Sequence, residues 1–154
     1  MAFRDFEKCN NYIFPEKQEL KTRIFDIIDK TTRAPAEFYL SESSKQFVRM
    51  DKAIVDDNQI YRFSDYGIQS SKDGICFILK ANMGTWYDRV PIIRDSFGIR
   101  TITPVECLSL MGFPKSFHFP EIPLKSKYKQ CGNSVIVAMI QKLLVIILHS
   151  HENI

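Results

Sequence analysis

The most reactive side chains in the sequence are four thiols. They stand far apart, with no Cys-x-x-Cys pair and no nearby pair of histidines: Cys9, Cys76, Cys107 and Cys131. Structural zinc sites and disulfide frameworks need closer spacing, so we expect reduced cysteines and no bound metal. A catalytic thiolate needs an adjacent base or a lowered pKa, and the sequence assigns neither to Cys107 or Cys131. We therefore predict no catalytic residue in this chain.

A polar turn, Gly132-Asn133-Ser134, stands directly before a very apolar segment. That segment, Val135 to Leu148, is 14 residues long and contains two polar residues, whereas a membrane span needs about 20 apolar residues. We predict a helix buried in protein and no membrane partner; the alternative is the core of a self-contained small domain. The charged N-terminus lacks the apolar region of a signal peptide, so we expect a cytoplasmic protein.

Basic and aromatic side chains interleave in the middle of the chain. Such a surface can pair with phosphates while a few side chains read base edges, although charged loop residues are often only solvated. The net charge is +3 with both signs mixed throughout, so any nucleic-acid surface must be local. The candidates are Arg62, Lys72, Lys80, Arg89, Arg94 and Arg100, with Tyr61, Trp86 and Tyr87 between them, and Asn82 and Gly84 in the adjacent loop.

Hydrophobic spacing predicts the elements that must hold these groups. Apolar residues at helical spacing predict a helix at about 17–30, and a second short helix is possible around Lys45 to Met50. Three short runs rich in β-branched and aromatic residues, separated by turn signals, predict small antiparallel strands. They are IYRF (60–63), GICFILKA (74–81) and VPIIRD (90–95). After Gly98 the pattern returns to helix.

The clearest local signal is a short, well-capped helix after Thr103. Thr103 is a good N-cap, Pro104 fits the first helical position, and Glu106 stands where a capping box needs an acid. Gly112 ends this helix and Pro114 follows it.

Two strings around this helix resemble, in the right order and at a normal separation, the last two motifs of DNA (cytosine-5) methyltransferases. They are R-T-I-T-P-V-E-C-L-S-L-M-G-F-P (100–114) and Y-K-Q-C-G-N-S-V (128–135). ANMGT (81–85) followed by VPII (90–93) looks like the end of the family's target-recognition domain, as found in bacterial restriction-modification enzymes. AFRD (2–5) resembles the strand after the family's glutamine-arginine motif. Residues 31–58 are the least assignable.

The resemblance implies an α+β chain with a small strand-and-turn target-recognition lobe. A short capped helix and a C-terminal apolar helix would follow and complete an S-adenosylmethionine-dependent α/β methyltransferase domain. The expected divisions are 1–30 at the edge of the catalytic domain, 31–112 as the DNA-binding lobe, and 113–154 as the return segment and final helix.

The resemblance also implies site residues. In the family, the turn corresponding to Asn133 and Ser134 helps to line the S-adenosylmethionine pocket, and the glycine at position 132 permits close approach. Double-stranded DNA would be bound by Arg62, Lys80, Asn82, Gly84 and Arg89.

The family's chemistry is only partly represented. The nucleophilic cysteine of its Pro-Cys motif, the glutamate of its Glu-Asn-Val motif and the glycine-rich cofactor turn are missing. At two positions of the first string the family usually has arginine, and this sequence has Val105 and Ser109 instead. Ile78 replaces a threonine expected to contact the backbone of the flipped base. These departures bear on activity and leave the fold assignment intact.

We therefore expect the recognition and cofactor-pocket-completing part of a methyltransferase, inactive as an isolated chain. A second chain with the Pro-Cys and Glu-Asn-Val motifs would be its partner. A split subunit is favoured over a truncated fragment. The alternative function is a non-catalytic DNA-binding module or an inactive remnant; an unrelated helical scaffold would not explain the two ordered motifs.

Overall fold

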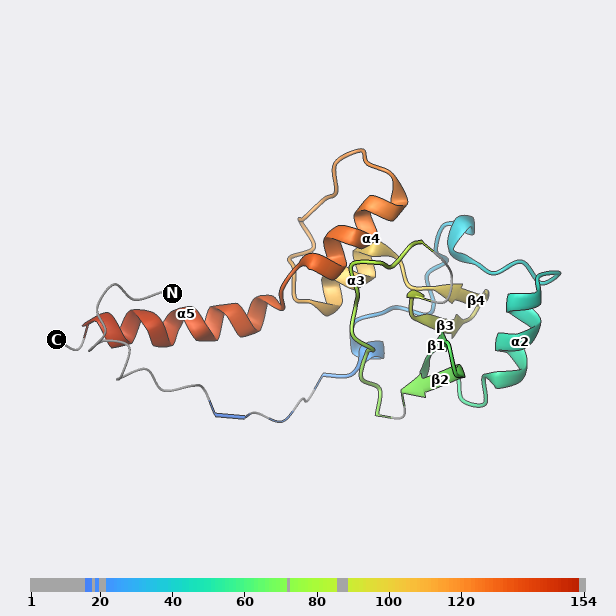
Figure 1. Cartoon of the computed structure of the whole chain (residues 1–154), viewed down its shortest axis with the longest axis horizontal. Helices are drawn as coiled ribbons and strands as arrows, with labels where there is room; N and C mark the ends of the chain where they lie inside the picture. The colour runs from blue at the N-terminus through green and yellow to red at the C-terminus, as the bar shows by residue number, and fades with distance from the viewer. Residues whose placement is uncertain (1–15, 18, 20–21, 72, 86–88, 153–154) are drawn as a thin grey trace. The chain divides into compact units, whose positions relative to one another are not determined.

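The computed structural model describes residues 16, 17, 19, 22–71, 73–85 and 89–152, with side chains as far as residue 148. The chain forms two compact units, of which Lys21–Ser134 is one and residues 1–20 together with 135–154 are the other. Figure 1 shows the helices and strands of both units. The candidate site lies in the larger unit.

The larger unit begins with irregular chain instead of the predicted helix. Among the described residues of 17–30, only Ile24–Asp26 is helical, as the 3-10 turn η1, so that prediction is wrong. The amide of Ile24 donates to the carbonyl of Gly74 at 2.8 Å, which ties the segment to a distant loop. Ile24 and Ile28 are buried in the core. The apolar spacing that predicts a helix here therefore reflects the packing of a short turn against the core.

A short helix follows where the sequence suggests one. After the 3-10 turn η2 (Ala36–Phe38), helix α2 spans Lys45–Ala53, which confirms the second predicted helix. The side chain of Ser44 caps it by accepting a hydrogen bond from the amide of Phe47 at 3.0 Å.

Four antiparallel strands form one sheet in the order β2-β1-β3-β4. Their bounds are β1 Ile60–Ser64, β2 Gly67–Ser71, β3 Ile92–Asp95 and β4 Gly98–Thr101. The strands predicted at IYRF and VPIIRD are confirmed, and so is the mixed α and β character of the chain.

The other strand assignments differ from prediction. Residues 75–80, inside the predicted strand GICFILKA, have no regular structure, because their apolar side chains pack on the core without a strand partner. Strands β2 and β4 follow hairpin turns at residues 65–66 and 96–97 and begin at Gly67 (φ 115°) and Gly98 (φ 147°), where glycine tolerates the positive φ. The helix expected after Gly98 begins only at Pro104.

The sheet separates two apolar clusters. Tyr61 and Phe63 of β1 pack with Met50 of α2 in one cluster, whereas Ile60 packs with residues of the two helices α3 (Pro104–Leu110) and α4 (Leu124–Asn133) in the other. Because side chains alternate along a strand, Arg62 lies on the same face as Ile60. This alternation places a cation at the margin of the larger cluster.

Helix α3 begins and ends as predicted. Thr103 Oγ1 accepts from the amide of Glu106 at 3.2 Å, and the Glu106 carboxylate accepts from the amide of Thr103 at 2.6 Å, which completes the capping box. Gly112, with φ 83°, follows the end of the helix. Helix α4 is not predicted by the sequence patterns.

The smaller unit contains the apolar helix α5 (Val137–Glu152), which confirms the predicted C-terminal helix. Its described side chains are half-buried or exposed, with Met139 and Leu148 each 59% exposed. They do not form the core of a self-contained domain among the described residues, and their burial against another part of the enzyme stays a prediction. By length and composition alone, Leu124–Leu148 could also cross a membrane. Its backbone is interrupted at Ser134, where ψ is 173°.

Candidate nucleic-acid interface

A groove of about 380 Å³ lies beside the β1–β2 hairpin in the larger unit. Four of the five predicted DNA-binding residues line it, although they come from a strand and two loops: Arg62, Lys80, Asn82 and Arg89. The fold therefore gathers into one hollow the polar residues that the sequence offered separately.

The groove is cationic with an apolar rim. Arg62, Lys80 and Arg89 line it together with one carboxylate, that of Asp65. Tyr66 at the hairpin turn is 96% exposed and Ile78 is 81% exposed. Cations that outnumber acids suit a polyanion, and exposed apolar side chains can contact bases or sugars.

Arg62 is held in place by two neighbouring side chains. Its Nε and Nη2 both donate to Oε1 of Gln69, at 3.0 and 2.8 Å. Its guanidinium carbon lies 4.4 Å from the centroid of the Phe77 ring. Lys80, by contrast, is an exposed side chain on a loop.

Gly84, the fifth predicted residue, is outside the lining of the groove and packs against α4. Its φ is 74°, and a Cβ there would lie 2.7 Å from Cδ2 of Tyr128. Tyr128 is buried and donates from its hydroxyl to the carbonyl of Ile102 at 2.6 Å. Gly84 thus lets the loop of residues 81–85 approach a buried aromatic ring.

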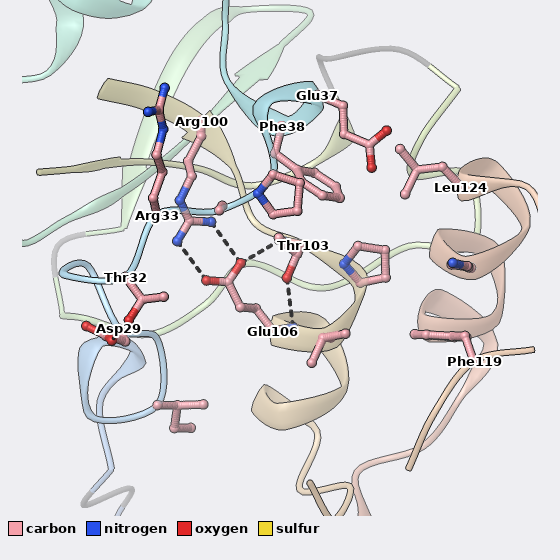
Figure 2. Close-up of a pocket in the computed structure, with 16 residues that line it drawn as sticks. Asp29, Thr32, Arg33, Glu37, Phe38, Arg100, Thr103, Glu106, Phe119 and Leu124 are labelled. Atoms are coloured by element: carbon pink, nitrogen blue, oxygen red, sulfur yellow. Dashed lines mark hydrogen bonds and ion pairs between the residues drawn. The ribbon is translucent and has the colours of Figure 1, made fainter. Parts of the chain in front are cut away.

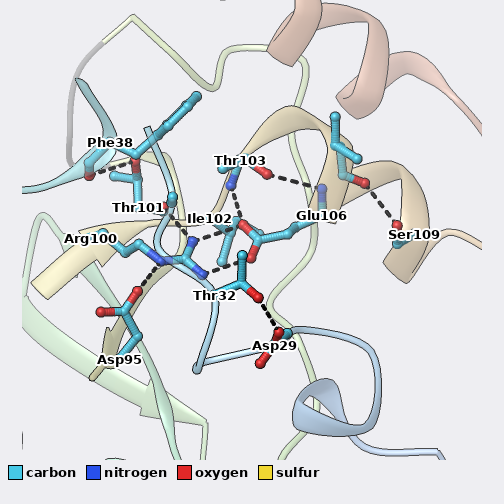
Figure 3. A network of polar contacts seen from close by, with 12 residues as sticks. Asp29, Thr32, Phe38, Asp95, Arg100, Thr101, Ile102, Thr103, Glu106 and Ser109 are labelled. Carbon is cyan, nitrogen blue, oxygen red and sulfur yellow. Dashed lines mark hydrogen bonds and ion pairs between the residues drawn. The ribbon is translucent and has the colours of Figure 1, made fainter. Parts of the chain in front are cut away.

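Two basic residues from the sequence candidates have structural roles instead. Arg100 is 1% exposed and pairs with Asp95 at 2.6 Å and Glu106 at 2.7 Å (Figure 3). Burial opposes its charged form, but the hydrogen bonds to Glu106 and Asp95 prevail and raise the pKa of Arg100, so it remains a cation. Arg94 pairs with the carboxylates of Asp51 and Asp57.

Of the aromatic candidates, Tyr61 lies in the described part of the chain and is not among the residues that line the groove. Tyr61 is 2% exposed, and its hydroxyl donates to the carbonyl of Asp56 at 3.0 Å. Lys72, Trp86 and Tyr87 lie outside the described residues.

The expected cofactor turn has a different local structure. Gly132 and Asn133 are the last two residues of α4, and the break comes at Ser134. The hydroxyl of Ser134 lies 2.7 Å from the carbonyl oxygen of Cys131 and 3.0 Å from the sulfur of Met111. Asn133 is exposed, so its amide remains accessible to a ligand.

Gly132 makes a close backbone approach, as predicted for a glycine there, but to protein. A Cβ at this position would lie 2.1 Å from the carbonyl carbon of Lys80 and 2.3 Å from the nitrogen of Ala81. The end of α4 is therefore pressed against the loop that carries a groove residue.

The cysteines have the properties of structural thiols. Desolvation raises the pKa of Cys76 to about 12, and hydrogen bonding to Cys131, together with burial, raises the pKa of Cys107. Neither change favours a thiolate at neutral pH. The same hydrogen bond with Cys107 lowers the pKa of Cys131, but that thiol is fully buried and so is closed to a substrate. Within the described part of the chain, these three cysteines form no disulfide and no cluster of side chains could hold a metal ion.

A second hollow, of about 620 Å³, is not predicted by the sequence. Figure 2 shows it between the segment of residues 27–38 and the helices α3 and α4, with the Arg100–Glu106 pair in its wall. Val105 lines it and is 62% exposed.

The family model for C-5 cytosine-specific DNA methylase matches residues 3–149. The chain belongs to this family. It is 34% identical over 144 residues to the type II methyltransferase M.Bsp6I of Bacillus sp. (strain RFL6), an alignment that covers 93% of the chain and 46% of that protein.

Shorter alignments connect this chain with other relatives. It is 46% identical over 46 residues to the type II methyltransferase M.MspI of Moraxella sp, covering 30% of the chain and 11% of that protein. It is 44% identical over 50 residues to the tRNA (cytosine(38)-C(5))-methyltransferase of Homo sapiens, an alignment that covers 32% of the chain and 13% of that protein. The chain thus spans less than half the length of each of these relatives.

Proposed function

We propose that this chain is the DNA-recognition and cofactor-pocket-completing part of a DNA (cytosine-5) methyltransferase of the restriction-modification type. The complete enzyme would transfer a methyl group from S-adenosylmethionine to C5 of cytosine in a specific duplex sequence, in the cytoplasm. The carrying observation is the cationic groove that unites Arg62, Lys80, Asn82 and Arg89. Its size and charge suit phosphates and base edges together.

The end of α4 would supply one edge of the S-adenosylmethionine pocket. Asn133 is exposed, so its amide can donate to and accept from a polar ligand. Ser134 donates its hydroxyl proton within the chain, which leaves its oxygen able to accept. These groups fit a polar ligand that is mostly held by other residues, and the bound cofactor would provide the methyl group.

The nucleophile must come from outside the described residues. Methylation at C5 needs a thiolate to add at C6 of a base extruded from the stack. The raised pKa of Cys76 and the complete burial of Cys107 and Cys131 do not suit that task. We propose that a second polypeptide with the Pro-Cys and Glu-Asn-Val motifs supplies it.

Helix α5 would be part of the contact with that catalytic chain. Seven large apolar side chains at its start and along its length are 36–59% exposed: Val135, Ile136, Met139, Ile140, Leu144, Val145 and Leu148. Full burial of such a side chain is worth roughly 1.5–3 kcal/mol. A partner that covers them would gain a large part of its affinity from this helix.

RNA is the second candidate substrate, because relatives that act on tRNA share about a third of the chain. Duplex DNA is favoured, since the alignment with a type II methyltransferase extends over 93% of it.

The test is transfer of labelled methyl groups to duplex DNA and to tRNA by this chain, by the catalytic chain, and by the two mixed. We expect transfer to DNA only in the mixture. Transfer by this chain alone would contradict the proposal and make Cys76, Cys107 and Cys131 the first residues to replace. Salt-sensitive duplex binding without transfer in any mixture would favour the non-catalytic module.

A further inference from the structure

We infer that Arg62 is the specificity-determining residue of the groove and reads the edge of a guanine in duplex DNA. Gln69 is then a positioning residue, and Phe77 is the platform on which the guanidinium rests. This inference rests on the proposed function and names the feature of the DNA that the groove recognises.

The backbone places Arg62 and Gln69 directly opposite each other. They are register partners in the antiparallel pair β1–β2, which is closed by a hairpin at Gly67. Side chains opposite each other in such a pair lie on the same face within direct reach. The backbone of Arg62 is therefore fixed by the sheet, which positions the arginine more precisely than a loop would.

The hydrogen bonds of Arg62 occupy one edge of its guanidinium. Nε and Nη2 both donate to the same oxygen of Gln69, which leaves the opposite edge, formed by Nη1 and the second hydrogen of Nη2. Nη1 makes no hydrogen bond to any described residue, and Arg62 lines the groove. Two parallel N–H donors on a fixed plane match O6 and N7 of guanine in the major groove.

Phe77 restricts the plane of that edge. The guanidinium carbon is 4.4 Å from the ring centroid, a cation–π stacking distance, and Phe77 itself packs against the larger apolar cluster. A side chain held in this way loses little conformational freedom on binding, which favours a geometric reading of a base over a loose phosphate contact.

The charge of Arg62 remains available. Its partner Gln69 is a neutral amide, whereas two other arginines of the sheet, Arg94 and Arg100, are paired with carboxylates. An arginine that only stabilised the sheet would gain more from such a carboxylate. Oriented by an amide, Arg62 keeps both its positive charge and its donor edge.

The experiment uses the full chain, alone and with its catalytic chain, and a duplex library with a randomised centre. The wild type should enrich sequences with guanine at one position. Arg62→Lys, which keeps the charge but lacks the two-donor edge, and Arg62→Ala should each lose that preference roughly tenfold or more. Gln69→Ala should also reduce the preference for guanine, whereas Lys80→Ala should weaken binding to all sequences alike.

A modified base identifies the contact. Replacing the enriched guanine with 7-deazaguanine removes N7, so it should weaken the wild type severalfold and weaken Arg62→Ala no further. Equal weakening of both proteins, or an unchanged sequence preference in Arg62→Lys, would overturn the role of Arg62 while leaving the proposed function intact. Absence of salt-sensitive duplex binding by the wild type would overturn both. Thermal melting of each variant shows that the comparison is made between folded proteins.

Discussion

The backbone of Gly132 lies directly against the backbone of Lys80, so closely that a Cβ would be 2.1 Å from the Lys80 carbonyl carbon. Lys80 lines the groove proposed to bind DNA, and Gly132 precedes the residues proposed for the cofactor pocket. The two proposed sites therefore share one rigid contact. Because the opposing atoms are main chain, a side chain at position 132 cannot be accommodated by a rotamer change.

Gly132→Ala should destabilise the larger unit by about 1–3 kcal/mol, in the range of overpacked cores. It should also weaken duplex binding, because the loop at Lys80 must move. Urea unfolding and DNA binding measure the two effects. Gln130→Ala, at an exposed position of the same helix, is the matched control and should stay within about 0.5 kcal/mol of the wild type. If Gly132→Ala proves as stable as that control, the close packing of the two backbones is contradicted.

Arg100 should be required for stability and not for DNA affinity. Its removal leaves the carboxylates of Asp95 and Glu106 without their partner, and breaking a buried pair in this way costs about 3–5 kcal/mol. Arg100→Met should therefore lower the free energy of unfolding by that order, with Glu106→Gln losing less because the amide can still accept hydrogen bonds. A variant that folds normally but binds DNA weakly would show that Arg100 binds a phosphate after all.

Cys76 should behave as an unreactive thiol. Its pKa is about 12 because of desolvation, so in a Cys9→Ser background its alkylation by iodoacetamide should keep accelerating with pH and should not level off near 9.0, the ordinary value for cysteine. The unfolded state binds fewer protons than the folded state above that pH, so stability should fall as the pH rises further. Alkylation that saturates near neutral pH would contradict this assignment.

Local signals and long-range contacts are not equally predictable from the sequence. Thr103 and Glu106 are three residues apart, so their capping box can be predicted from spacing alone, and α3 follows it. Ile24 bonds to Gly74, fifty positions along the chain, and no local pattern indicates that its segment gives up a helix. The strand prediction at 75–80 is wrong for the same reason, since core packing without a strand partner uses the same residue types.

The candidate site shows the same division. Residue types are enough to select Arg62, Lys80 and Arg89, but their convergence on one groove depends on the fold. Arg100 is selected for its charge and is buried. A signal for that is present in the sequence, because Asp95 and Glu106 flank it within six positions. Helix α4 escapes prediction since its composition is polar and its burial of Tyr128 depends on α3.

DNA affinity should depend on salt and on the two exposed cations of the groove. Replacing Lys80 and Arg89 together with alanine should weaken binding at every sequence and reduce the slope of log affinity against log salt by roughly 0.9 for each phosphate that is no longer neutralised. Filter binding at several salt concentrations measures the slope. Affinity that is indifferent both to salt and to these changes would exclude an electrostatic DNA interface here.

Variants at the end of α4 test the cofactor proposal independently of the DNA proposal. Asn133→Ala removes an exposed amide that makes no hydrogen bond within the described part of the chain, so it should weaken S-adenosylmethionine binding by the assembled enzyme while leaving stability and DNA affinity nearly unchanged. Ser134→Ala should weaken cofactor binding too, but it also removes the hydroxyl that bonds to the Cys131 carbonyl, a cost to stability of about 1 kcal/mol.

Calorimetric titration of the cofactor into the complex, together with urea unfolding of each variant, distinguishes the two effects. Ser134→Thr keeps the hydroxyl and serves as the control for the second residue. If Asn133→Ala and the double variant bind the cofactor as tightly as the wild type, neither residue belongs to the pocket, and this end of α4 serves only to hold the loop at Lys80.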